Sequence, residues 1–571
     1  MTADRSRPPT LEVRLARLMR QRALGHISEE DYESRRDLLL GARGAASLPP
    51  RPADTSTPTA GRTARKRRPA PQRFTQDWAT WGAARDGARV VLTRAQVCAL
   101  VLLALLVPIL LVLQAHWTLI GIIAFVTVLY VALGAHRIWL LIRGELGLAE
   151  VASTHPTATE KDLPIYTVLV PLHHEARMLP ILVEHLKSID YPPSRLDILL
   201  LIEKDDRETQ KAARNCPLPR HIGIMIMPPG QPRTKPRALN VGLYAARGEY
   251  IVIYDAEDRP EPDQLRKAVA AFRSLPADVV CLQARLNFYN RHQSLLTRLF
   301  AVDYATWYDQ LLLGLAHSRG APSGVFAPLG GTSNHFRVDK LRQIGGWDPF
   351  NVTEDCDVGV RLGRVGLRVA MLDSVTWEEA IPHVRPWIRQ RSRWVKGYIQ
   401  TYLVHMRHPI SLWKQLGSRG FIDFQMLVGG SSLVLLLNPL MWTLTVLYVA
   451  EKGTQVGNLV ETLFPAPLYY PALLSLVVVN FILFYCNAYV CVRHNYLDLT
   501  RYTLLTPLYW ILMSAGAWVG LVSLIRNPSY WAKTEHGISL SATNRPAPPA
   551  VGYLNAERSV ASQLAPSNEG W

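Results

Sequence analysis

Cysteine is scarce in this chain. Six Cys occur in 571 residues, and none of them forms a C-x-x-C pair. This pattern argues against a zinc-ribbon site and a dense disulfide framework, and it is typical of a reducing compartment. The N-terminus also lacks an apolar stretch of the signal-peptide type. We therefore expect the first long apolar run to direct insertion into a membrane.

Acidic residues are outnumbered. The chain has 46 Asp and Glu against 63 Lys and Arg, a formal net charge of +17, while 49% of its residues are hydrophobic. A basic chain is often a nucleic-acid binder with a cationic groove, or a membrane protein with cytoplasmic Lys and Arg. Long apolar runs favour the second class, so no nucleic-acid partner is expected.

Five apolar runs frame the central part of the chain. A bilayer core of about 30 Å needs roughly 20 apolar residues, so runs of this length predict a multi-pass protein of the inner (plasma) membrane. The first two form a segment at 95–142 and the other three a region at 421–526. The runs cover residues 95–114, 118–141, 421–450, 468–492 and 503–525.

Charge predicts the orientation. Residues 1–94 carry 19 Lys or Arg against 10 Asp or Glu, so this region and the central domain are expected in the cytoplasm. The side of the tail at 527–571 stays open. Either the run at 421–450 holds two passes, broken at Asn438-Pro439, or the last run is re-entrant or interfacial.

The N-terminal region is expected to hold a helical hairpin at about 11–40 and a disordered linker at about 43–73. Ser28 and the acids after it suit the start of the second helix, because they cap it and meet the positive end of its dipole. The linker is rich in Pro, Ala, Thr and Arg. The hairpin resembles the short SHOCT modules. The basic run at 65–68 either touches anionic lipid or is solvated.

Residues 157–409 alternate between strand and helix patterns. Alternation of this kind predicts an α/β fold, a doubly wound and mostly parallel sheet inserted between the membrane helices. Ligands of such sheets bind beyond the carboxyl ends of the strands, which is where the acidic clusters fall. Strands are expected at 166–170, 198–202, 250–254 and 279–283, and helices at 179–188 and 236–246.

The cluster Asp255-Ala256-Glu257-Asp258 follows the third expected strand. Carboxylates approach a nucleoside diphosphate only through a divalent cation. Mg²⁺ and Mn²⁺ take one or two carboxylates together with phosphate oxygens. Asp255 and Glu257 are the expected metal ligands for Mg²⁺ or Mn²⁺. The alternative for this tetrapeptide is a solvated acidic turn.

Two further clusters carry chemistry. In Thr353-Glu354-Asp355, the carboxylate of Asp355 is the expected catalytic base, with Glu354 beside it. The alternative role is helix capping, since residues 357–364 suit a helix. Downstream, Gln390 and Arg393 suit phosphate binding, and Trp394 offers a flat face to a sugar ring. The alternative there is an interfacial amphipathic helix at 383–402.

In this order and setting, the motifs resemble glycosyltransferase family 2. The stretch from Tyr166 to about Val404 is similar to the processive membrane synthases, which make cellulose, mixed-linkage glucan, hyaluronan or poly-N-acetylglucosamine. The Gln390-x-x-Arg393-Trp394 motif carries the similarity to processive enzymes. The resemblance implies a UDP-sugar donor and a growing polysaccharide acceptor.

The same resemblance implies further site residues. Glu175, Glu203, Asp205, Lys235, Asp255, Gln390 and Arg393 would bind the nucleotide sugar. Asp206 competes with Glu203 and Asp205 for the base and ribose. Thr332 and Ser333 would lie near the acceptor with Trp394. The family's Asp-x-Asp is Asp255-x-Glu257 here, so the choice between Glu257 and Asp258 as the second metal ligand stays open.

The tail holds one more motif. Residues 530–537 resemble a segment that closes over the bound nucleotide, in which Lys533 or Thr534 would reach the diphosphate. The alternative is a plain juxtamembrane anchor.

Together these patterns predict an inverting, metal-dependent hexosyltransferase of the bilayer. It would use a UDP-sugar to extend a β-linked exopolysaccharide such as a glucan and export it, with periplasmic or other export partners. One alternative is single-sugar transfer to a lipid or short glycan. A second is a non-catalytic export or receptor subunit.

Overall fold

The computed structural model describes Asp31 and residues 87–151, 162–228, 230–316, 326–528 and 530, without the side chains of 146–151. Three regions predicted from sequence therefore lie outside the described residues, apart from Asp31 and Tyr530. They are the hairpin at 11–40, the linker at 43–73 and the closing segment with Lys533 and Thr534.

An eight-stranded sheet forms the centre of the domain, in the order β3-β2-β1-β4-β7-β6-β8-β5. Strands β1 to β4 run parallel, β7 runs antiparallel to both of its neighbours, and β6 and β8 are parallel again. The strand bounds are β1 Tyr166–Leu172, β2 Leu196–Ile202, β3 Ile222–Ile226, β4 Tyr250–Ile253, β5 Arg259–Pro260, β6 Val279–Phe288, β7 Asn334–Arg337 and β8 Arg368–Glu378.

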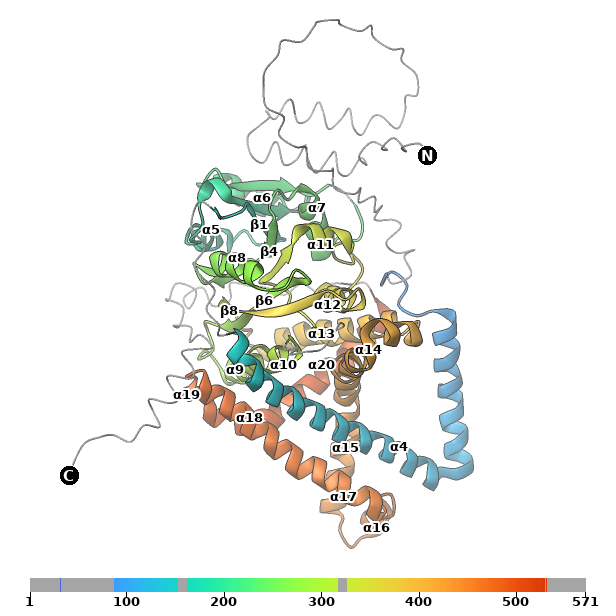
Figure 1. Ribbon diagram of the computed structural model, residues 1–571. Helices are drawn as coiled ribbons and strands as arrows, with labels where there is room; N and C mark the ends of the chain where they lie inside the picture. The colour runs from blue at the N-terminus through green and yellow to red at the C-terminus, as the bar shows by residue number, and fades with distance from the viewer. Residues whose placement is uncertain are drawn as a thin grey trace, which may run out of the picture.

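Helices cover the sheet (Figure 1). Every residue of β2 is buried, including Asp197, and its other six residues are apolar, as expected for a strand covered on both faces. The first helices are short, and α9 begins with a capping box between Ser294 and Thr297. Their bounds are α5 Leu179–Lys187, α6 Arg207–Asn215, α7 Lys235–Ala245, α8 Gln264–Ser274, α9 Leu295–Thr306, α10 Leu312–Ala316, α11 Val338–Gln343, α12 Glu354–Arg364 and α13 Val384–His405.

The α/β prediction is confirmed, with a difference in the direction of two strands, β7 and β5. The four expected strands are present as β1, β2, β4 and β6, and both expected helices begin within one residue of their predicted positions. The sheet is mixed because β7, a mostly buried strand of sequence Asn-His-Phe-Arg, inserts antiparallel between β4 and β6, and because the two-residue β5 pairs antiparallel with β8. A short polar strand of this kind has no alternating pattern to reveal it.

Among the described residues, four helical stretches are long and apolar enough to cross a membrane: 94–145, 409–450, 466–493 and 497–526. The first, α4 (Arg94–Val151), breaks at Gln114, where φ is −147° and ψ is 55°. That break separates the two predicted runs. In Figure 1 the first half of α4 stands apart from the other helices, and its Val112 is 86% exposed. An apolar surface of this extent is typical of contact with lipid.

The remaining helices follow the sheet domain in sequence. Helix α13 packs closely against α20, because Gly516 and Gly520 of α20 leave room for its backbone. A Cβ at Gly520 would lie 2.6 Å from the Ser392 oxygen. The bounds are α14 Pro409–Phe424, α15 Ser431–Ala450, α16 Gln455–Thr462, α17 Ala466–Leu474, α18 Asn480–Arg493, α19 Leu497–Thr500 and α20 Thr506–Arg526.

Candidate active site

A cavity of about 1170 Å³ lies between the sheet domain and the apolar helices. At the sheet end it is lined by residues that follow strands β1, β2 and β4 and by the start of α12. It continues past α13 and between the apolar helices α4, α15 and α17. Most of the predicted site residues line it: Glu175, Glu203, Lys235, Asp255, Glu257, Thr332, Glu354, Asp355, Gln390, Arg393 and Trp394.

Asp255 lies two residues beyond β4, at the carboxyl edge of the sheet. Its two oxygens are 2.5 and 2.7 Å from Nζ of Lys235, the first residue of α7. The same ammonium donates to the Gly331 carbonyl at 2.9 Å. Burial alone would lower the pKa of Lys235, but the carboxylates of Asp255 and Glu354 raise it above its ordinary value. This lysine is therefore a fixed positive charge.

The two candidates for the second metal ligand differ in direction. Glu257 lines the cavity. Asp258 turns back into the sheet, where its Oδ2 accepts hydrogen bonds from the Asp255 amide, at 2.7 Å, and from the Thr332 hydroxyl. Burial and the nearby charges of Asp255 and Glu257 raise the pKa of Asp258 well above its ordinary value. Asp258 therefore shapes the turn that presents Asp255.

Glu354 and Asp355 occupy the first turn of α12. The Asp355 side chain accepts a hydrogen bond from the Cys356 amide at 2.7 Å. Burial raises the pKa of Asp355 to about 6, against the opposing effects of that bond, Lys235 and Arg393. Burial and the Asp355 charge also raise the pKa of Glu354. A carboxylate with a pKa near 6 suits a general base that works at neutral pH.

Helix α13 presents Gln390, Arg393 and Trp394 to the cavity. The Trp394 ring stacks on Tyr304 with a centroid distance of 6.2 Å and an interplanar angle of 24°. Arg391, which sequence reasoning did not single out, lies 4.4 Å from the centroid of Trp394. These contacts fix the indole as a rigid surface beside the acids of α12.

Arg391 is held from two other helices. Its guanidinium is 2.9 Å from Asp303 Oδ2 of α9, and the Tyr509 hydroxyl of α20 donates to the same oxygen at 3.0 Å. The surface around Trp394 therefore depends on segments about 90 residues before and 115 residues after it. In the sequence, the contacts of Arg391 with Asp303 and Tyr509 have no local signal other than the neighbouring Gln390 and Arg393 motif.

The acids after β2 have separate positions. Glu203 lines the cavity, and its carboxylate is 3.6 Å from Arg237. Asp205 does not line the cavity and pairs with Arg233. Asp206 caps α6 by accepting from the Thr209 amide at 3.1 Å. Burial raises the pKa of Glu203. Of the three acids, Glu203 alone faces the cavity.

The two residues predicted to lie near the acceptor, Thr332 and Ser333, point in different directions. Thr332 lines the cavity. Ser333 is fully buried and donates to the Thr376 hydroxyl at 2.6 Å, so it points into the sheet. Glu378, at the end of β8, lines the cavity and was missed in the sequence. Burial and the charges of Asp258 and Glu257 raise its pKa. The sequence pattern that could have identified Glu378 is the acidic pair Glu378-Glu379 at the end of a strand.

The residues present fit a divalent cation of the Mg²⁺ or Mn²⁺ type. In the described part of the chain, no group of three or more His, Cys, Asp or Glu side chains has the arrangement to hold an ion by itself. Asp255 and Glu257 offer two hard oxygen ligands at the cavity wall, and phosphate oxygens normally complete such a site. Both oxygens of Asp255 already contact a cation, the Lys235 ammonium.

Polar and aromatic side chains line the part of the cavity among the apolar helices. The Tyr130 hydroxyl of α4 donates to Asn438 of α15. His136 is 2.8 Å from buried Asp423. Further lining residues of this part are Trp442, Tyr448, Tyr469 and Tyr470. Ionisable and amide groups are rare inside membrane segments and mark polar pathways.

Comparison with known proteins gives a consistent result for the sheet domain. Residues 164–397 match the family described as "Glycosyltransferase like family 2". The chain is 24% identical over 240 residues to "Probable glycosyltransferase YdaM" of Bacillus subtilis, covering 42% of this chain and 56% of that protein. It is 25% identical over 311 residues to "Probable glucomannan 4-beta-mannosyltransferase 10" of Arabidopsis thaliana, covering 52% and 54%.

The chain thus spans about half the length of the curated relatives it matches. A solved structure, "Mannosyltransferase PcManGT from Pyrobaculum calidifontis in complex with GDP-Man and Mn2+", is 18% identical. It covers 70% of this chain and 99% of its own, with a TM-score of 0.42.

Proposed function

We propose, from the premise that residues 164–397 form a domain of glycosyltransferase-like family 2, that this protein is a processive membrane glycosyltransferase. It extends a β-linked polysaccharide from a UDP-sugar and exports the product. The observation that carries the proposal is the single cavity, which joins the acids at the sheet edge to the polar path among the apolar helices. The domain faces the cytoplasm and the helices span the inner membrane.

The reaction begins at Asp355. Its carboxylate takes the proton of the acceptor's terminal hydroxyl, and that oxygen attacks the anomeric carbon of the donor. The bond from the anomeric carbon to the diphosphate breaks on the opposite face, so the configuration inverts. Lys235, whose pKa is raised, and Arg393, whose guanidinium stays protonated, line the cavity and supply positive charge for the leaving diphosphate. Glu203 and Glu175, which line the sheet end of the cavity, are the proposed contacts of the nucleoside.

A divalent cation held by Asp255 and Glu257 would stabilise charge on the leaving diphosphate as a Lewis acid. Asp258 contributes to this cation site indirectly, because its hydrogen bonds hold the Asp255 backbone and the Thr332 side chain in place.

The acceptor enters over Trp394, whose indole offers a flat apolar face to the terminal sugar. Beyond it, the tyrosines and Trp442 of the membrane part line a path of aromatic faces and hydrogen-bonding groups. A chain extended at Asp355 would move along this path. Single-sugar transfer needs no such path, which is why polymer synthesis is the better fit.

The donor sugar is a hexose. UDP-glucose is the first candidate, and the names of the plant relatives make a mannosyl nucleotide the second. Wild-type protein in bilayer nanodiscs should be incubated with UDP-glucose, UDP-N-acetylglucosamine, UDP-glucuronate and GDP-mannose, followed by product sizing and linkage analysis. Long products from one donor support the proposal. Single-sugar products from every donor would replace it with single transfer, and no turnover with any donor would favour a non-catalytic subunit.

A further inference from the structure

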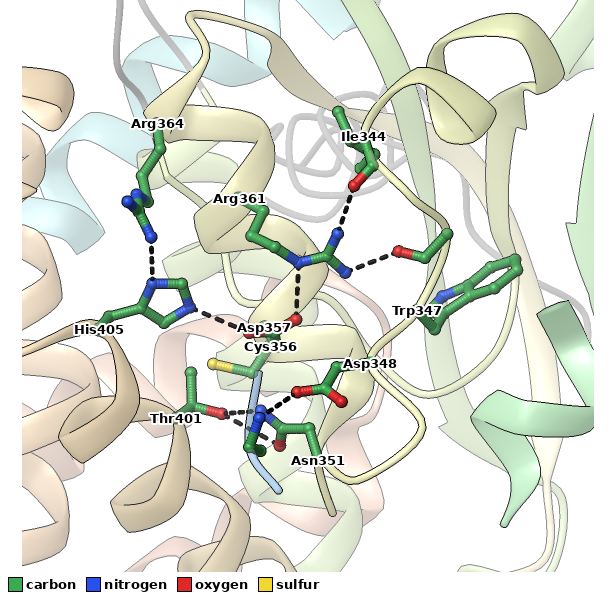
Figure 2. A network of polar contacts seen from close by, with 12 residues as sticks. Ile344, Trp347, Asp348, Asn351, Cys356, Asp357, Arg361, Arg364, Thr401 and His405 are labelled. Carbon is green, nitrogen blue, oxygen red and sulfur yellow. Dashed lines mark hydrogen bonds and ion pairs between the residues drawn. The ribbon is translucent and has the colours of Figure 1, made fainter. Parts of the chain in front are cut away.

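A buried polar network joins α12 to the C-terminal end of α13 (Figure 2). Its centre is Asp357, two residues after Asp355 and fully buried. Arg361 of the same helix donates from Nε to one Asp357 oxygen at 2.7 Å. His405, the last residue of α13, lies with Nε2 3.0 Å from the other oxygen. The Asp357 carboxylate therefore connects α12, which carries Asp355, to α13, which carries Trp394.

The network fixes the tautomer of His405. Arg364 is 3.0 Å from His405 Nδ1, and a guanidinium can only donate. Nδ1 must therefore accept, so Nε2 carries the proton and donates to Asp357, and the ring is neutral. Burial alone would raise the pKa of Asp357, but the charge of Arg361 and the hydrogen bond from His405 lower it below its ordinary value. The direction of every hydrogen bond is thus set from Arg364 through His405 to Asp357.

Helix α13 also packs against the loop that precedes α12. Gln400 accepts from the Val352 amide at 3.0 Å, and Asn351 donates to the Thr401 hydroxyl at 3.0 Å. Gly397 lies so close that an added Cβ would be 2.4 Å from Thr353 Cγ2. These contacts precede Glu354-Asp355 in the chain and the His405 contact follows it. The base is therefore bracketed by α13 on both sides.

We propose that His405 is a positioning residue of the transfer reaction, which links α13 to α12 through Asp357 and so keeps Asp355 at a fixed distance from Trp394 and Arg393. This inference rests on the proposed function and adds a residue to it. His405 has 3% exposure and does not line the cavity, so it acts on the reaction only through Asp357. A neutral donor is suited to this role, because the contact holds without a third positive charge beside Arg361 and Arg364.

The test compares His405→Leu with His405→Gln in the full-length chain. Leucine removes both hydrogen bonds. Glutamine can restore both, because its amide nitrogen donates and its oxygen accepts. A displacement of about 1 Å at a reacting group costs up to about 100-fold in rate. We expect His405→Leu to lower kcat for transfer by about 10- to 100-fold with the donor KM unchanged, and His405→Gln to recover most of it.

Two readouts separate positioning from folding. The ratio of transfer to donor hydrolysis should fall in His405→Leu, whereas a loss of folded protein would lower both rates together. Looser packing would also hydrate Asp355, whose burial holds its pKa near 6, and so shift the acid limb of kcat to lower pH. His408→Leu, an exposed histidine three positions on, should change neither readout.

An unchanged ratio and pH profile in His405→Leu would overturn the inference. If that variant does not accumulate, Arg364→Met serves instead, because it leaves His405 in place and removes the donor that fixes its tautomer. Its transfer-to-hydrolysis ratio should fall, and an unchanged ratio would overturn the inference equally. Failure of the proposed function would look different, since wild-type protein would then make only single-sugar products or turn over no donor.

Discussion

The proposed donor side and the proposed acceptor side of the cavity are built in different ways. On the donor side, Glu203 and Asp255 lie just beyond buried strands, and short turns of the sheet domain hold them. On the acceptor side, Trp394 stands on a helix, and α9 and α20 hold the arginine that packs on it. The sheet can build the first side alone. The second requires α20, one of the apolar helices, so the sheet domain and the apolar helices meet at α13.

Asp355→Asn affects the step that both sides share, so it should have the largest effect. The amide cannot take the acceptor's proton, and losing a general base typically costs 10²- to 10⁴-fold, so a fall of about 1000-fold is expected. The rate of sugar incorporation measures it. Membrane insertion and nucleotide binding should stay normal. Incorporation within ten-fold of wild type would contradict the role of Asp355.

The pH profile reports the same carboxylate. Because burial raises the pKa of Asp355 to about 6, its basic form prevails above that pH and is lost below it. We expect kcat to fall by about ten-fold per pH unit below 6, with Asp355 and Glu354 titrating as a pair. A kcat that stays flat from pH 8 to pH 5 would remove Asp355 from this role.

Asp255→Ala tests the donor side alone. Removing this carboxylate should weaken binding of the nucleoside diphosphate in the presence of divalent cation by more than about ten-fold, the effect of losing even a supporting group at a metal site. Calorimetric titration with UDP, with and without Mg²⁺ or Mn²⁺, measures it. Ser333→Ala, whose side chain points into the sheet, is the control. Unchanged dependence on the cation would refute Asp255 as a ligand.

Trp394→Ala tests the acceptor side alone. Aromatic stacking contributes about 0.5–1.5 kcal/mol, so elongation should fall by about 2- to 12-fold while donor hydrolysis changes little. Product length and released UDP, measured in one reaction, separate the two rates. Equal losses in both would count against stacking on the acceptor.

Tyr509→Phe should have the smallest effect. It removes the hydroxyl that donates to Asp303 and accepts from Arg391, while the ion pair between Arg391 and Asp303 stays in place. A net loss of about 1 kcal/mol is therefore expected, so elongation should fall by no more than about five-fold. Tyr502→Phe, a tyrosine outside this cluster, is the control. A larger loss in donor binding than in elongation would contradict the separation of the two sides.

The donor side could be predicted from sequence because its side chains follow recognisable strands. Buried apolar runs located β2 and β4, and the acids just after them had to lie at the carboxyl edge of the sheet. The sequence pattern did not show in which direction the side chains of Glu257 and Asp258 point. Glu257 and Asp258 are adjacent in sequence, and the bond from the Asp255 amide to Asp258 separates them.

The acceptor side was predicted only in part. Gln390, Arg393 and Trp394 were found by their motif, but their supports were not. Asp303 and Tyr509 meet Arg391 only after α9 and α20 pack on α13. The link from His405 to Asp357 has the same origin, since no local pattern connects residues 48 positions apart. Tertiary packing rather than local sequence decides these contacts.

The most direct test of a shared cavity is a cryo-electron microscopy structure of the protein in a lipid bilayer after turnover with its donor. Sugar density should begin beside Asp355 and Trp394 and continue between α15 and α17, past Trp442 and Tyr448. Product that leaves on the sheet side, with lipid or closed packing among the apolar helices, would contradict it.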